Sequence, residues 1–144
     1  MNDLLLMCTI AGRDAAIPAL RVQTVLEIDA ITPIPGTPDF ICGLTPLRSQ
    51  ALTVVDCALA LGFDQPCSSP ERRAAVVEVD GHLYALMVDS AQDVSEARSD
   101  LVAIPGGLGE GWQRAGLGMV ETETGPVVLV DIEKIIAGPP ALAA

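Results

Sequence analysis

The side chains that could support acid–base or nucleophilic chemistry in this sequence are few and scattered. His82 is the single histidine, and no nucleophile stands at a spacing that would pair with it in a catalytic arrangement. Asp56, Asp89 and Asp131 are candidate acid–base groups. Asp56 and Asp131, however, each precede a short apolar segment whose helical form needs an N-terminal cap. The sequence therefore predicts no enzyme active site, and we expect His82 to be structural.

The cysteines do not form a recognisable metal or redox motif. Cys8, Cys42, Cys57 and Cys67 show no Cys-x-x-Cys spacing, and one histidine cannot complete a common zinc site. Because Cys8, Cys42 and Cys57 lie in apolar patterns, we expect all four to be reduced thiols, with Cys8 and Cys57 buried. The glycine-rich residues 107–111 lack the Gly-Lys-Ser/Thr of a phosphate-binding loop. We expect neither a metal nor a cofactor.

Composition narrows the classes of partner. The formal net charge is −11, so a nucleic-acid backbone or an anionic membrane surface would be repelled on average. No apolar run approaches the ~18 residues of a membrane span, and no secretory signal is recognisable at the N-terminus. We therefore expect a cytoplasmic protein without nucleic-acid partners or direct membrane insertion. Half of the residues are hydrophobic but only 3% are aromatic, so Val, Leu, Ile and Ala must build the core.

Most of the chain has the pattern of short strands separated by turns. Residues 4–10 form a continuous apolar run typical of a strand covered on both faces, and Asp80-Gly81 predicts a hairpin between strands at 74–79 and 82–88. We further expect a helix over residues 20–28, because Val22, Val25 and Leu26 have helical spacing, a helical turn near residues 91–93, and a strand over residues 112–121. The spaced prolines of residues 29–39 predict an extended connector, and residues 63–71 predict a flexible loop.

One supersecondary unit is repeated in the chain. Gly43-Leu44 opens a strand, a turn follows, and a second strand ends at Asp56, which is placed to cap a short helix that Gly62 can stop. The same plan recurs from Gly116-Leu117 to Asp131, whose helix ends at Gly138. The repeat predicts two similar small β-barrels that share an apolar centre. We expect one domain over residues 1–138, with intertwined subdomains of about 1–70 and 71–138, and a frayed tail at 139–144.

The centre of the chain resembles a known family. Residues 31–48, Ile-Thr-Pro-Ile-Pro-Gly-Thr-Pro-Asp-Phe-Ile-Cys-Gly-Leu-Thr-Pro-Leu-Arg, are similar to the central segment of the CheW-like family, which has spaced prolines, a Gly-Ile/Leu pair and Asn-Leu-Arg-Gly. Residues 25–28, 52–56 and 86–89 resemble flanking segments of the same family. Pro46, Ser49 and Thr53 depart from it, since the family usually has Asn, Gly and Pro there. These departures bear on the shape of the turn that carries Arg48, and hence on partner choice, more than on the fold.

The resemblance implies a mainly β fold of two SH3-like five-stranded barrels packed around a shared apolar core, with short helices. It also implies a non-enzymatic adaptor that links the helical cytoplasmic tips of chemoreceptors to the regulatory domain of the chemotaxis histidine kinase. Two alternatives stay open. One is a divergent adaptor of the same fold that serves a non-motility signalling system, and the other is a small ligand-binding β-barrel.

Six residues are the candidates for partner contact. The resemblance implies that Arg48 contacts the receptor or the kinase, and the guanidinium offers several donors in a fixed fork. Apolar side chains from segments that meet where the barrels join should partly complete the core and partly form a groove for an amphipathic helix. Glu27 should sit at the rim of that groove, where it could select a basic residue. The apolar candidates are Val25, Ile28, Leu44 and Val88.

Overall fold

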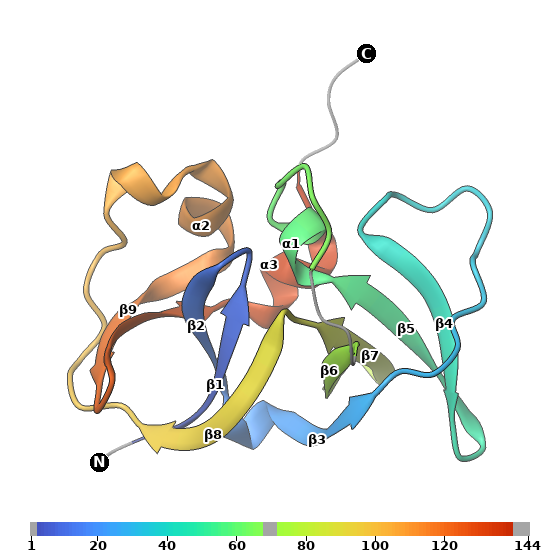
Figure 1. Cartoon of the computed structure of the whole chain (residues 1–144), viewed down its shortest axis with the longest axis horizontal. Coiled ribbons are helices and arrows are strands. Elements are labelled where there is room, and N and C mark those ends of the chain that lie inside the picture. The colour runs from blue at the N-terminus through green and yellow to red at the C-terminus, as the bar shows by residue number, and fades with distance from the viewer. Residues whose placement is uncertain (1–2, 68–71, 140–144) are drawn as a thin grey trace.

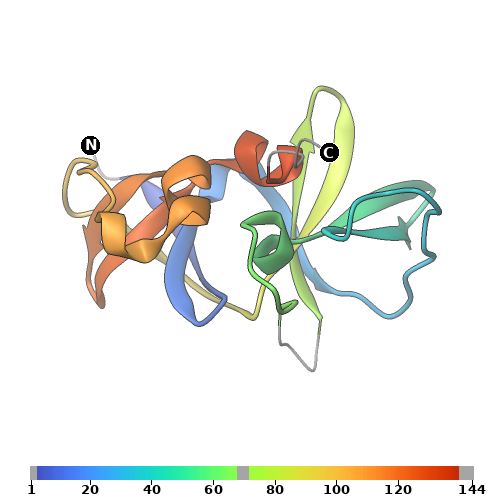
Figure 2. The same cartoon turned by 90° about the horizontal axis from the view of Figure 1, so that it is seen from above.

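The protein, seen here in a computed structural model that describes residues 3–67 and 72–139, folds into two curled five-stranded sheets that lie side by side (Figures 1 and 2). The expected loop at 63–71 and tail at 139–144 fall partly outside the described residues. The strands are β1 (Leu4–Ile10), β2 (Arg13–Pro18), β3 (Val22–Glu27), β4 (Ile41–Leu47), β5 (Gln50–Asp56), β6 (Arg73–Val79), β7 (His82–Met87), β8 (Ser90–Glu96), β9 (Gly116–Thr122) and β10 (Gly125–Val130). The helices are η1 (Ala19–Arg21), α1 (Cys57–Ala60), η2 (Gly106–Leu108), α2 (Glu110–Ala115) and α3 (Ile132–Ala137). The predicted mainly β, two-barrel fold is confirmed.

The two barrels exchange strands. Barrel A has the strand order β8-β1-β2-β10-β9, and barrel B has the order β3-β6-β7-β5-β4. Each strand of barrel B therefore has a counterpart at the same place in barrel A, and the strand numbers of the two differ by five. The parallel contact of β10 with β2 has its counterpart in the parallel contact of β5 with β7. Both the first and the second half of the chain contribute strands to both barrels.

The repeated strand–turn–strand–helix unit is present in both barrels. The Asp56 carboxylate accepts a hydrogen bond from the backbone N–H of Leu59, at 3.1 Å, at the start of α1. Asp131 accepts one from the N–H of Lys134, at 3.2 Å, at the start of α3. The predicted caps are thus confirmed, and Gly138, with φ of 75°, ends α3 as expected.

The alignment of glycines between the repeats differs from the one expected. The structural counterpart of Gly43 is Gly118, two residues beyond the expected Gly116. Each of the two lies against the carbonyl of a crossing residue: a Cβ at Gly43 would lie 2.2 Å from the Thr32 oxygen, and one at Gly118 would lie 2.8 Å from the Val102 oxygen. The crossing residues pair with the next residue of β4 or β9, so the glycines are required by close backbone approach.

Residues 20–28 do not form the expected helix. They form the short η1 turn and strand β3, and residues 91–93 lie within strand β8 in place of the expected helical turn. Both strands contain a bulge, because the register shifts between Val22 and Thr24 in β3 and opposite Leu6 and Cys8 in β8. A bulge adds one residue and interrupts the period of two, so that Val22, Val25 and Leu26 acquire a spacing that imitates a helix.

Residues 112–121 are strand only from Gly116 onward. The preceding residues form α2, which buries Trp112 and Ala115 on one face. Residues three apart share a face of a helix, so the short segment covers the centre of the molecule with its single tryptophan.

The apolar core has three parts. A central cluster receives side chains from both sheets and from all three α-helices, with Ile17, Leu86 and Trp112 among its members, and it forms the shared core that the repeat predicts. Barrel B has its own interior around Leu52 and Val76, and barrel A has one around Leu5 and Val127. Helices α1 and α3 contact each other above the junction of the barrels (Figure 2).

Candidate partner-binding surface

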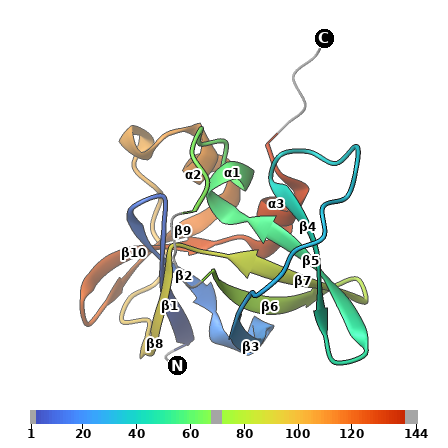
Figure 3. The ribbon, with the colours of Figure 1, turned by 45° about the vertical axis from the view of Figure 1, so that its right-hand side comes forward.

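Strand β3 forms one edge of barrel B and carries the first part of the candidate surface. Its outward residues Gln23, Thr24 and Glu27 are exposed, whereas Val25 is half-buried and packs on the central cluster. An edge strand with exposed polar side chains is accessible to another protein without disturbing the core. Figure 3 shows β3 along the lower edge of barrel B, beside the hairpin of β4 and β5.

Glu27 lies at the end of β3, opposite Arg73 of β6. The Glu27 carboxylate is 3.6 Å from the Arg73 guanidinium, and both side chains are well exposed. An exposed pair of this kind contributes at most about 1 kcal/mol to stability. The Glu27 charge is therefore available at the surface without being essential to the fold.

Ile28 and Val88 belong to the buried part of the candidate set. Ile28 is 4% exposed in the interior of barrel B, and Val88 is 0% exposed in the central cluster. Both are fixed next to Glu27 by the backbone, since the Ile28 N–H donates to the Arg72 carbonyl and the Val88 N–H to the Arg73 carbonyl. Val25, Glu27, Ile28 and Val88 thus come together around the ends of β3, β6 and β7, with Ile28 and Val88 supporting this surface from within.

Arg48 occupies the tight turn between β4 and β5. The register pairs Leu47 with Gln50, so that two residues form the turn, and Arg48 has a φ of 57°. The residue of this turn with positive φ is thus Arg48. Ser49, which stands where the family usually has Gly, is not among the residues with positive φ, so the turn does not need a glycine at that position. The exposed Arg48 side chain lines a cavity of about 260 Å³ together with Gln23 and Thr24 of β3.

Leu44 stands apart from the other apolar candidates. It lies on β4, at the opposite edge of the sheet from β3, and is half-buried beside Thr32, with which it exchanges two backbone hydrogen bonds of 2.8 and 2.9 Å. Four of the six candidates therefore lie around the end of β3. The other two, Leu44 and Arg48, lie on β4 and in the turn that follows it. Gln23 and Thr24, which lie next to Arg48, were missed because a helix was expected there.

The thiols do not form a reactive centre. All four cysteines are free, and Cys8 and Cys57 are buried as predicted. Burial raises the pKa of Cys8 to about 12 and also raises the pKa of Cys57, Cys42 and Cys67. Such thiols are protonated at neutral pH and react slowly. Within residues 3–67 and 72–139, no three His, Cys, Asp or Glu side chains are grouped so as to hold a metal ion, and no helix is long and apolar enough to cross a bilayer.

Comparison with known proteins gives a family for this architecture. The sequence profile described as "CheW-like domain" matches residues 4–139. The chain belongs to the CheW-like family. Among curated proteins, the chemotaxis protein CheW of Klebsiella aerogenes is 27% identical over 137 residues, covering 92% of this chain and 80% of that protein. CheW of Thermotoga maritima is 27% identical over 118 residues, covering 81% of this chain and 76% of that protein.

A solved structure supports the fold of this CheW-like chain. The crystal structure of the scaffolding protein TtCheW from Thermoanaerobacter tengcongensis superposes with a TM-score of 0.77 over 90% of this chain and 84% of that one, at 23% identity. The similarity bears on the arrangement of the two barrels, which the CheW-like chain shares. The family profile over residues 4–139 confirms, over nearly the whole chain, the resemblance that residues 31–48 indicate.

Proposed function

We propose that this CheW-like protein is a non-enzymatic adaptor in the cytoplasm that couples chemoreceptors to the regulatory domain of the chemotaxis histidine kinase. The match of the family profile to residues 4–139 carries the proposal, together with relatives named chemotaxis protein CheW. The protein would join receptor arrays through its partners.

The receptor would bind along β3 in this proposal. Val25 supplies half-buried apolar surface, Glu27 supplies an exposed charge at the strand's end, and Arg48 supplies a guanidinium at its other end. Gln23 and Glu27 are separated by about 13 Å along an extended strand. An amphipathic helix of the receptor tip could therefore contact the rim charge and the turn together.

Glu27→Lys tests the receptor site. We expect the variant to keep its circular dichroism spectrum and to bind a purified receptor cytoplasmic fragment more slowly and more weakly at low salt, since a rim charge acts mainly on association. Surface plasmon resonance at two salt concentrations measures the effect. The matched control is Glu121→Lys, which makes the same charge change at an exposed position of β9, in barrel A and away from β3.

Wild-type kinetics for Glu27→Lys at low salt would remove β3 from the receptor site. Equal losses in both variants would mean that net charge, and not this position, governs association. Co-purification of the wild-type protein with a receptor or a histidine kinase from native lysate tests the coupling role itself. Recovery of a signalling complex without chemoreceptors would favour an adaptor of a non-motility system.

A further inference from the structure

Two small cavities adjoin Arg48 at the mouth of barrel B, where β3 lies beside the β4–β5 turn. Their volumes are about 260 and 190 Å³, and Gln23, Leu47 and Arg48 line both of them. Leu26 of β3 lines the larger cavity, and Leu83 of β7 lines the smaller one. The three leucines are half-buried and pack on the interior of barrel B. Hydrocarbon surface is therefore accessible beside the Arg48 guanidinium.

Arg48 is an unpaired cation in these surroundings. All other residues that line the two cavities are uncharged, and Arg48 has no ion pair within residues 3–67 and 72–139. Its φ of 57° is a conformation that glycine adopts more easily, so the turn presents this guanidinium at the expense of local strain. Residues held in such conformations cluster at binding sites. The group that this position suits is an anion.

The same place in barrel A is polar. Each leucine that lines the cavities of barrel B has a polar or acidic counterpart there, and the arginine has an acidic one. The registers of the two sheets pair Leu26 with Ser95, Leu47 with Thr122, Leu83 with Asp14, and Arg48 with Glu123. Because barrel A folds with polar residues at these places, the fold alone does not require leucine or arginine there. Their presence in barrel B points to a partner.

We propose that the two cavities accept two adjacent side chains of a receptor helix, an apolar one in the larger cavity and a carboxylate beside Arg48 in the smaller one. This inference rests on the proposed receptor site along β3 and adds the chemistry that the partner must present. The smaller cavity also offers the Ser49 hydroxyl and the Gln50 amide as donors to a carboxylate. The two partner residues should be three or four positions apart, because such residues lie side by side on a helix.

The net charge of −11 does not prevent this contact. Exposed charges farther away than about 8 Å are largely screened at physiological ionic strength. A carboxylate at the guanidinium would instead be paired at hydrogen-bond distance, where Arg can donate through two parallel N–H groups. The leucines would shield this pair from water, so the local attraction exceeds the distant repulsion.

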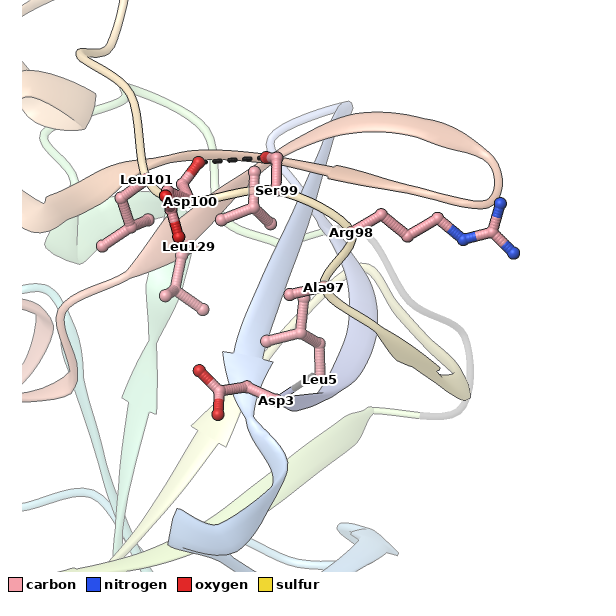
Figure 4. A pocket seen from close by; sticks show the side chains of 9 residues that line it. Asp3, Leu5, Ala97, Arg98, Ser99, Asp100, Leu101 and Leu129 are labelled. Carbon is pink, nitrogen blue, oxygen red and sulfur yellow. Dashed lines mark hydrogen bonds between the residues drawn. The ribbon is translucent and has the colours of Figure 1, made fainter. Parts of the chain in front are cut away.

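Arg48→Gln tests the charged contact through binding of a purified receptor cytoplasmic fragment. We expect the affinity to fall about threefold to tenfold, as for a partly exposed ion pair. The matched control is Arg98→Gln, which makes the same charge change at an exposed position of barrel A. Figure 4 shows the Arg98 guanidinium pointing away from the other labelled side chains. This control should keep the wild-type affinity.

Charge exchange identifies the carboxylate of the partner. Arg48→Glu should bind the wild-type fragment weakly, and changing one exposed acidic residue of the receptor tip to lysine should restore part of the binding. The apolar contact is located by NMR: the methyl resonances of Leu26, Leu47 and Leu83 should shift saturably with the fragment, and those of Leu129 in barrel A should not. No restoration by any tip residue, or unshifted resonances of the three leucines, would overturn the proposal.

The outcomes separate this inference from the proposed function. A wild-type protein that binds no receptor fragment would contradict the coupling role itself. Wild-type binding with equal affinities for Arg48→Gln and Arg98→Gln would contradict only the inference. If Arg48→Gln loses affinity for a fragment of the kinase regulatory domain and keeps it for the receptor, the cavities belong to the kinase and the proposal is wrong.

Discussion

At the residue scale, Asp56 and Asp131 occupy equivalent positions in the two barrels, but Asp56 accepts more hydrogen bonds. Asp56 is 1% exposed, and its carboxylate accepts hydrogen bonds from Leu59 N–H and from Cys67 N–H, the latter at 3.0 and 3.2 Å. Asp131 accepts a cap bond from the Lys134 N–H and is only half-buried. Asp56 therefore joins the loop after α1 to the start of that helix, in addition to capping it.

Asp56→Ala and Asp131→Ala should separate these roles. We expect Asp131→Ala to lower the free energy of unfolding by about 1 kcal/mol, the usual effect of a lost cap. Asp56→Ala should lower it by about 2–4 kcal/mol, because the Cys67 N–H also loses its charged acceptor. Urea denaturation of both variants measures the difference. Equal losses would show that the bond to Cys67 contributes nothing.

Arg48 combines backbone strain with an exposed charge. A residue other than glycine at positive φ costs about 1 kcal/mol, so Arg48→Gly should stabilise the protein by about that amount. Arg48→Ala should leave stability nearly unchanged. If the guanidinium contacts a partner, both variants should bind the receptor or kinase fragment more weakly. A stabilised Arg48→Gly variant with wild-type affinity would assign the residue to the turn alone.

Arg114 connects the three short helices at the element scale. Its guanidinium donates to the Ala60 carbonyl at the end of α1, at 2.6 Å, and to the Lys134 carbonyl in α3, at 2.9 Å. Helices of four to six residues have little stability of their own, so they depend on such contacts and on packing. Partial desolvation also lowers the pKa of Arg114 from its ordinary value, although the group stays charged near neutral pH.

Arg114→Ala should lower the free energy of unfolding by about 2–3 kcal/mol, since two carbonyls lose a charged donor. Arg114→Lys should recover only part of this loss, because an ammonium cannot reach both carbonyls with the geometry of a guanidinium. Thermal denaturation of the two variants tests the comparison. Full recovery by lysine would mean that charge, and not the fork, holds the helices.

The pattern of the elements also explains which ones were predictable. The repeated strands, hairpins and aspartate caps follow from local signals, such as Asp80-Gly81 and the apolar run at residues 4–10. The bulges of β3 and β8 are set by pairing with strands far away in sequence, so the local spacing of Val22, Val25 and Leu26 indicated a helix. Trp112 was assigned to a strand because a six-residue helix has too few turns to establish its period.

The candidate surface was predictable only in part for a related reason. Val25, Glu27, Ile28 and Val88 do converge, as the two-barrel arrangement requires. A strand that is covered on both faces has apolar residues at nearly every position. The sequence therefore does not distinguish the fully buried Val88 from a partly exposed valine. The distance of Leu44 from β3 depends on the strand order of barrel B, which residue types do not encode locally.

At the scale of the whole molecule, the connection between the barrels is fastened by Arg21 and Glu133. Arg21 lies in η1 between β2 and β3, and its guanidinium pairs with the Glu133 carboxylate on α3. This hydrogen bond lowers the pKa of Glu133 below its ordinary value of 4.5. A lowered pKa in the folded state means that the contribution to stability is present above pH 4.5 and is lost as the pH falls through the folded-state pKa.

Glu133→Gln should therefore be less stable than wild type at pH 7, by no more than about 1 kcal/mol for an exposed pair. The difference should shrink at acid pH, as the pH falls through the lowered pKa of Glu133 and the wild-type carboxyl becomes protonated. Urea midpoints at both pH values give the comparison. A difference that persists at low pH would point to packing of the side chain in place of its charge.

The exchange of strands has a consequence for synthesis. Barrel A contains both β1, the first of the ten described strands to be synthesised, and β10, the last of them, so it cannot close until all ten have emerged from the ribosome. All five strands of barrel B have been synthesised once β7 is made. The chain then returns to barrel A, where β8 pairs with β1. The N-terminal hairpin of β1 and β2 therefore waits with the outer edge of β1 unpaired until β8 emerges and that of β2 unpaired until β10 emerges. A stalled or shortened chain would expose an apolar strand to aggregation.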